Sequence, residues 1–234
     1  MTKIGKDNTV FIVDDELGAR DSIVSMVRIM GFPVKAFDSG EDFLSGNHHQ
    51  QVGCVVSDLR MRGMSGITML ATMRQQGSCM PLILVTAYAD VTLAVEALER
   101  GAMTILEKPY RAQALWDCIV RALQRDQEQR AIASQRANLL NRIRSLNEEE
   151  SRILEMIVRD VPNKVIAARL QISMRTINHR RSEILTKLQT ENLTSLIWHL
   201  GEIGWSTVST MVDSVELAPN STCSHSDLKY RNSK

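Results

Sequence analysis

Apolar runs of four or five residues alternate with segments of helical periodicity along the first 120 residues. Each run is rich in β-branched or aromatic residues and ends in polar ones, which predicts buried strands. The five runs lie at residues 9–13, 34–37, around Val55 and Val56, at 81–85 and at 103–106. Apolar residues at helical spacing fill the gaps, around residues 19–30, 39–44, 67–75 and 91–100. Strands that alternate with helices predict an α/β fold with a doubly wound, five-strand parallel sheet.

The second half of the chain has only helical periodicity. Residues 111–147 lack Gly and Pro and are rich in good helix formers, which predicts helix from the end of the α/β domain through the linker. A solvated connecting helix and a short dimeric coiled coil both remain open for this stretch. Three further helices follow, at about 148–161, 163–170 and 174–189, and the tight turn between the last two predicts a small all-α helix-turn-helix domain.

These patterns predict four parts. Residues 1–124 form the α/β domain, 125–145 the helical linker and 146–206 the helix-turn-helix domain. Residues 207–234 are rich in Ser, Thr, Asn and Asp, and we expect a disordered tail there.

Composition narrows the class of protein. The net charge is +1, and residues 1–110 hold ten Lys and Arg against thirteen Asp and Glu, so a general polyelectrolyte role on nucleic acid is excluded. No apolar run could span a bilayer, residues 1–10 lack the h-region of a signal peptide, and the four cysteines show no zinc spacing. We expect a cytoplasmic protein with reduced thiols and no membrane partner.

Polar residues converge at the carboxyl ends of the predicted strands. Asp14 and Asp15 follow the first strand, Asp58 the third, Thr86 the fourth and Lys108 the fifth. Ligands bind at this edge of parallel sheets, and clustered carboxylates with a few waters suit Mg²⁺. We argue that three such carboxylates stay ionised only around a divalent cation. Asp58 could then attack a phosphoryl group, with Lys108 and Thr86 placed to bind its oxygens.

The helix predicted at 174–189 carries cations and amides off its apolar face. Such side chains suit a recognition helix, although an ordinary solvated basic face has the same pattern. They are Arg175, Thr176, Asn178, His179, Arg180, Arg181 and Lys187.

The set of Asp14-Asp15, Asp58, Thr86 and Lys108-Pro109 on a five-strand pattern resembles the receiver domain of bacterial two-component response regulators. The resemblance implies a flavodoxin-like fold and phosphotransfer from a sensor histidine kinase onto Asp58. It also implies Mg²⁺ held by Asp15, Asp58 and the Arg60 carbonyl, with Asp14 assisting through water, and phosphoryl sensing by Thr86 and Lys108.

Two positions depart from that family. Arg62 stands where Pro is usual, and Ile105 where an aromatic switch residue is usual. Neither is needed for phosphorylation, but the usual coupling of a swinging ring to the Thr does not transfer.

Residues 146–188 resemble a LuxR-type helix-turn-helix domain, and the domain order resembles FixJ/NarL-type response regulators. The resemblance implies double-stranded DNA as a partner, with Asn178 and His179 facing the bases. It places six residues on or near phosphates: Lys164, Arg175, Thr176, Arg180, Arg181 and Lys187. A fourth helix at residues 193–203 often forms the dimer contact in this family.

Four residues depart from the LuxR-type pattern. Asp160, Gln171 and Gln189 stand where Gly is frequent, and Arg180 where His is usual. We expect Gln171 to adopt a left-handed conformation in the turn, at a cost of roughly 1 kcal/mol.

The sequence therefore predicts a non-enzymatic, phosphorylation-controlled DNA-binding transcription regulator that forms a homodimer when phosphorylated. An alternative is a DNA-binding regulator whose receiver dimerises without phosphorylation, motivated by Arg62 and Ile105. A phosphohydrolase is the third and weakest hypothesis, because the third strand ends in Asp58-Leu59-Arg60 and lacks a paired Asp.

Overall fold

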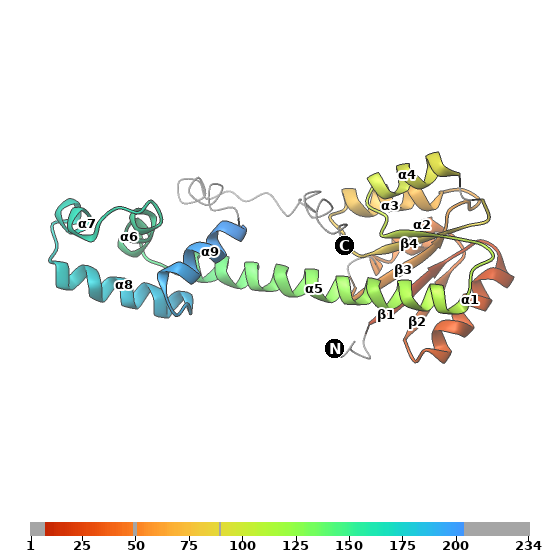
Figure 1. Ribbon diagram of the computed structural model, residues 1–234, viewed down its shortest axis with the longest axis horizontal. Helices are drawn as coiled ribbons and strands as arrows, with labels where there is room; N and C mark the ends of the chain where they lie inside the picture. The colour runs from red at the N-terminus through yellow and green to blue at the C-terminus, as the bar shows by residue number, and fades with distance from the viewer. Residues whose placement is uncertain (1–7, 49–50, 89, 204–234) are drawn as a thin grey trace, which may run out of the picture. The chain divides into compact units, whose positions relative to one another are not determined.

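The structure is a computed structural model that describes residues 8–48, 51–88 and 90–203 (Figure 1). It divides into two compact units, and the division falls between Arg130 and Ala131. The predicted tail lies outside the described residues.

The first unit is a five-stranded parallel sheet in the order β2-β1-β3-β4-β5. This is the doubly wound order that the alternating pattern predicts. The strands are β1 (Thr9–Val13), β2 (Val34–Phe37), β3 (Gly53–Asp58), β4 (Leu82–Thr86) and β5 (Thr104–Glu107). The helices between them are α1 (Leu17–Ile29), α2 (Gly40–Ser45), α3 (Gly66–Gln75) and α4 (Val91–Glu99). The predicted bounds differ from these by one or two residues.

Both faces of the sheet are covered, as its near-continuous apolar strands require. Val55 points into a cluster with Phe11, Phe43 and residues of α3. Its neighbour Val56 points to the opposite face, into a cluster with residues of α1 and α5. Successive side chains of a strand alternate between faces, so one apolar strand contributes to both cores. Figure 1 shows α3 and α4 on one side of the sheet and α1 and α5 on the other.

Helix α5 (Ala112–Arg144) is one continuous helix of 33 residues. Its first part packs Leu115 and Ile119 on the sheet, and its last part places Leu139 and Ile143 in the core of the second unit. Residues 131–138 between these contacts are exposed. The last receiver helix and the predicted linker are therefore one element.

Two residues fasten α5 to the sheet. The buried Asp126 accepts a 3.0 Å hydrogen bond from the backbone N–H of Gly53, where β3 begins. Arg130 pairs with Asp126 and also donates to the Gln51 carbonyl. A buried carboxylate is stable only with such partners. Asp126 and Arg130 lie further along α5 than the apolar residues that pack this helix on the sheet.

The second unit is all-helical. Its helices are α6 (Glu148–Val158), α7 (Asn163–Leu170), α8 (Met174–Leu188) and α9 (Leu193–Ile203). Asn147 and Glu150 form a capping box at the start of α6, with bonds of 2.8 and 3.0 Å. Ile153, Ile166 and Ile177, one from each of the first three helices, are fully buried in a shared core.

The turn between α7 and α8 confirms the conformation expected of Gln171, which has φ 56°. Asp160 and Gln189 are also left-handed, at φ 55° and 53°. Asp160, Gln171 and Gln189 therefore each have a backbone conformation that Gly would adopt without the steric cost of a Cβ atom.

The cysteine expectation is partly wrong. Cys54 and Cys118 are free and buried, whereas Cys79 is in a disulfide.

Candidate functional site

The pairing register brings the predicted site residues to one edge of the sheet. Val13 pairs with Ser57 across β1 and β3, so Asp14 and Asp58 are the next residues on neighbouring strands. Val85 pairs with Leu106 across β4 and β5, which places Thr86 and Lys108 close to the same edge. The Lys108 backbone N–H donates a 2.7 Å hydrogen bond to the Thr86 carbonyl.

Lys108 joins two of the carboxylates. Its ammonium Nζ lies 2.8 Å from Asp58 Oδ1 and 3.3 Å from Asp14 Oδ2. Burial acts to lower the pKa of Lys108, but hydrogen bonding and attraction from Asp58, and then from Asp14, hold that pKa above its usual value. Lys108 is therefore a charged donor beside Asp58.

Asp14 is almost completely buried at the end of β1. The pKa of its carboxyl is raised, chiefly by burial. The Glu16 N–H and Lys108 act to lower this pKa, and the negative charge of Asp58 acts to raise it further. Glu16 donates its backbone N–H to Asp14 Oδ1 at 2.9 Å, which fixes the orientation of the carboxylate.

Asp58 is oriented by backbone as well as by Lys108. Its Oδ2 accepts the backbone N–H of Arg60 at 2.8 Å, while Oδ1 faces Lys108. The Asp58 side chain is 12% exposed, so it is held in place yet open to an incoming group. A positioned carboxylate that remains accessible can act as a nucleophile.

Thr86 is buried and its hydroxyl is engaged within its own loop. Thr86 Oγ1 donates to the Tyr88 carbonyl at 3.0 Å and accepts from the Tyr88 N–H at 3.2 Å. The Arg60 guanidinium lies 6.0 Å from the centre of the Tyr88 ring. Ile105 packs, partly buried, against the core cluster that contains Phe11.

Asp15 is held by a residue that the sequence analysis noted only as a departure from its family. Arg62 donates to Asp15 Oδ2 from its backbone N at 3.2 Å and from its side-chain Nε at 3.1 Å. All three carboxylates thus have a cationic partner in the protein.

The donor atoms at this edge are those that Mg²⁺ prefers. Carboxylate oxygens from Asp14, Asp15 and Asp58 are hard ligands, and Mg²⁺ needs only one or two of them besides water. Within the described part of the chain, no three His, Cys, Asp or Glu side chains are already arranged around a metal position. The three carboxylates are suitable ligands for Mg²⁺. Lys108 and Arg62 now make contacts with their oxygens.

The second candidate surface is the outer face of α8 with the start of α7. Lys164, Arg175, Asn178 and His179 are exposed there. Thr176 is partly exposed, and its hydroxyl lies 2.9 Å from that of Ser173, the N-cap of α8.

Asn163 links the two helices of this surface. Arg181 donates to Asn163 Oδ1 at 2.7 Å, and the Asn163 side-chain nitrogen lies 3.4 Å from Asn178 Oδ1. These contacts fix the angle at which α7 and α8 present their polar side chains.

Two of the predicted phosphate contacts are paired with acids instead. Lys187 Nζ lies 2.6 and 2.8 Å from the two carboxylate oxygens of the buried Glu150. Arg180 lies 3.0 Å from Glu183 and 3.5 Å from Glu149. Sequence reasoning missed the pair of Lys187 and Glu150, because these residues are 37 positions apart and no local pattern joins them.

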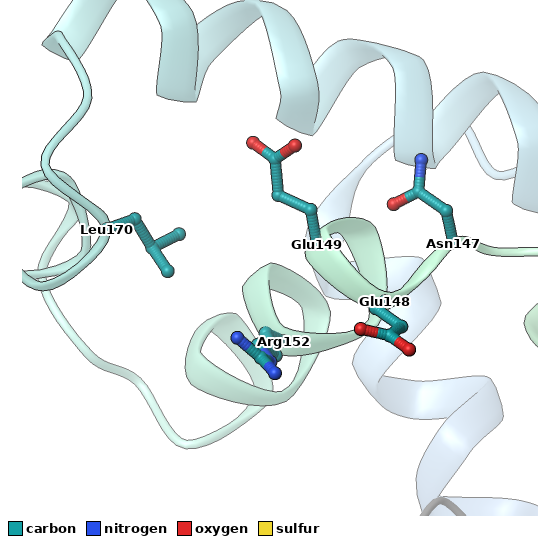
Figure 2. A pocket seen from close by; sticks show the side chains of 5 residues that line it. All are labelled: Asn147, Glu148, Glu149, Arg152 and Leu170. Atoms are coloured by element: carbon teal, nitrogen blue, oxygen red, sulfur yellow. The ribbon is translucent and has the colours of Figure 1, made fainter.

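A hollow of about 430 Å³ lies beside α6, lined by Asn147, Glu148, Glu149, Arg152 and Leu170. Figure 2 shows the Glu149 carboxylate pointing toward a neighbouring helix and away from Arg152. The hollow is open and mainly acidic at its rim, so it is unsuited to a phosphate backbone.

Comparison with known proteins defines the class. Residues 10–120 match the response regulator receiver domain, and residues 144–200 match the bacterial regulatory proteins of the luxR family. The chain belongs to the response regulators that join a receiver to a LuxR-type DNA-binding domain, and it is a phosphorylation-controlled transcription regulator. None of the helices in the described ranges is long and apolar enough to cross a membrane.

Individual regulators and a solved structure are similar to this chain over most of its length. The chain is 35% identical to the transcriptional regulatory protein TdiR of Thauera aromatica, over 80% of this chain and 82% of that one. It is also 35% identical to FixJ of Bradyrhizobium diazoefficiens, over 80% and 92%. The solved structure of the response regulator StyR matches with a TM-score of 0.74 and 34% identity, over 84% of this chain and 99% of that one.

Proposed function

We propose that Asp58 is the residue that accepts the phosphoryl group, from the phosphohistidine of a sensor kinase. The observation that carries this proposal is the set of contacts at Asp58: Lys108 on Oδ1, the Arg60 N–H on Oδ2, and partial exposure. In the transfer, an Asp58 oxygen forms a bond to phosphorus as the phosphorus–nitrogen bond of the phosphohistidine breaks. The imidazole then takes up a proton.

Asp15, Asp58 and the Arg60 carbonyl are the residues that would hold Mg²⁺, with Asp14 assisting through water. When bound, Mg²⁺ supplies charge neutralisation for the phosphoryl oxygens. Lys108, which already faces Asp58, would bind one phosphoryl oxygen as a point charge. The Thr86 hydroxyl would bind another after leaving the Tyr88 carbonyl, and this exchange is the sensing step that we propose.

We further propose that α8 binds double-stranded DNA. Asn178 and His179 are exposed, as contacts to base edges require. The residues proposed on or near phosphates are Lys164, Arg175, Thr176, Arg180, Arg181 and Lys187. Of these, Arg180 and Lys187 would first have to leave Glu183 and Glu150.

Phosphorylation would act by favouring one of two states of the protein, and we propose that the favoured state is a homodimer in the cytoplasm. We propose that the chain is divided into four parts: residues 1–124 form the receiver, 125–145 the linker, 146–206 the DNA-binding domain and 207–234 the tail.

The test is operator affinity with and without a phosphoryl donor, for the natural protein and for Asp58→Ala. The operator is first selected from random duplexes. We expect the donor to tighten binding of the natural protein and to leave the variant unchanged. Equal affinity in all four measurements would favour a receiver that acts without phosphorylation.

A further inference from the structure

Arg62 makes two contacts to a single carboxylate oxygen. Its backbone N and its side-chain Nε lie 3.2 and 3.1 Å from Asp15 Oδ2. The Arg62 side chain is 90% exposed, whereas that of Asp15 is 22% exposed. The arginine therefore reaches in from solvent to a carboxylate that is itself mostly enclosed.

The loop around Arg62 is fixed on both sides, so these contacts do not depend on a freely moving chain. Met61 is buried in the core of the first unit. The Met64 N–H donates to Glu41 Oε1 at 2.9 Å. Gly63 lies between them at φ 81°, where a Cβ would come within 2.9 Å of the same Glu41 oxygen.

The contacts change the electrostatics of Asp15. Burial acts to raise the pKa of the Asp15 carboxyl, but the Arg62 backbone N–H and then the Arg62 side chain hold this pKa below its usual value.

The other two carboxylates share Lys108, which lies between Asp14 and Asp58. Asp15 is outside that pair, and within the described residues its ion pair is with Arg62. For Asp15 to bind a metal shared with Asp58 through Oδ2, this oxygen would have to exchange the two Arg62 donors for the metal.

We propose that Arg62 is a positioning residue that competes with Mg²⁺ for Asp15. The guanidinium and the backbone N–H both donate to Asp15 Oδ2, and Mg²⁺ that binds this oxygen displaces them. The affinity of the receiver for Mg²⁺ is then set partly by a residue that is not a ligand. This inference rests on the proposed function of the site.

The test is a Mg²⁺ titration of the full-length protein, followed by the amide signals of Asp15 and Asp58 in NMR spectra. Arg62→Ala removes the Nε–H and the charge, and we expect it to bind Mg²⁺ about two- to fivefold more tightly, the range that an exposed ion pair supports. Arg62→Pro also removes the backbone N–H, so we expect still tighter binding.

Arg28→Ala is the matched control. It removes an equal charge from the last turn of α1, at the opposite edge of the sheet from Asp15, and we expect unchanged affinity. The second readout is the Arg62 Nε–H signal of the natural protein, which should shift with the same midpoint as the Asp15 amide.

The outcomes separate the inference from the function beneath it. Equal Mg²⁺ affinity in the natural protein and both Arg62 variants would overturn the inference and leave the proposed function standing. If the variants bind Mg²⁺ more tightly but the Arg62 Nε–H signal of the natural protein does not move, the effect comes from the overall electrostatic field and not from displacement of Arg62. That result would also overturn the inference. A natural protein that shows no Mg²⁺ response would overturn both.

Discussion

The pair of Glu150 and Lys187 predicts an asymmetric cost of mutation. The Glu150 side chain is 3% exposed and that of Lys187 is 45% exposed. Among the described residues, Lys187→Met leaves the buried Glu150 carboxylate with the Asn147 N–H as its remaining hydrogen-bond donor. We expect a loss of about 2–3 kcal/mol in the free energy of unfolding. Glu150→Gln keeps an oxygen for the capping box and lets Lys187 turn to water. Its expected cost is about 1 kcal/mol.

The pH dependence adds an independent check. Burial acts to raise the pKa of Glu150, but Lys187 and the Asn147 N–H lower it below its usual value. A carboxyl with a lowered pKa contributes stability above its unfolded pKa and loses that contribution as the pH falls through its folded pKa. The cost of Lys187→Met should therefore be largest near neutral pH and shrink as the solution is acidified below the ordinary pKa of Glu.

The assay is native-state hydrogen exchange of the α6 and α8 amides in the full-length protein, which reports opening of the second unit by itself. The double variant completes a cycle that isolates the coupling between the two residues. A cost of Glu150→Gln equal to or above that of Lys187→Met would refute the reasoning that the buried partner is the one that cannot be left alone.

Two further predictions concern backbone and anchoring. Gln171→Gly should stabilise the second unit by about 0.5–1 kcal/mol, because Gly has no Cβ penalty at φ 56°, and urea denaturation checks this; a loss of stability would contradict the αL assignment. Asp126→Ala removes the acceptor of the buried Gly53 N–H and should cost about 1–3 kcal/mol, measured as thermal unfolding of the receiver, with exposed Asp117→Ala as the control. Equal melting temperatures for these two aspartate variants would show that Asp126 is no anchor.

The sequence was sufficient where structure follows from local pattern. Val55 and Val56 mark a strand that is buried on both faces, and its end places Asp58 at the sheet edge. Asn147 and Glu150 lie three positions apart, the spacing of a capping box, so this cap follows from the local sequence. Gln171 occupies the left-handed position because the turn between α7 and α8 requires one.

The contacts that the sequence could not supply join residues far apart in the chain. Arg62 reaches Asp15 across 47 positions and Asp126 reaches Gly53 across 73, and neither pair has a periodic signal.

The central claim is that this receiver takes a phosphoryl group on Asp58. The most direct measurement is the intact mass of the full-length protein after incubation with acetyl phosphate and Mg²⁺, with Asp58→Asn alongside. The account predicts one phosphoryl addition, which is absent in Asp58→Asn and when EDTA removes the metal. An unmodified natural protein that is folded, or an addition that persists in Asp58→Asn, would contradict it.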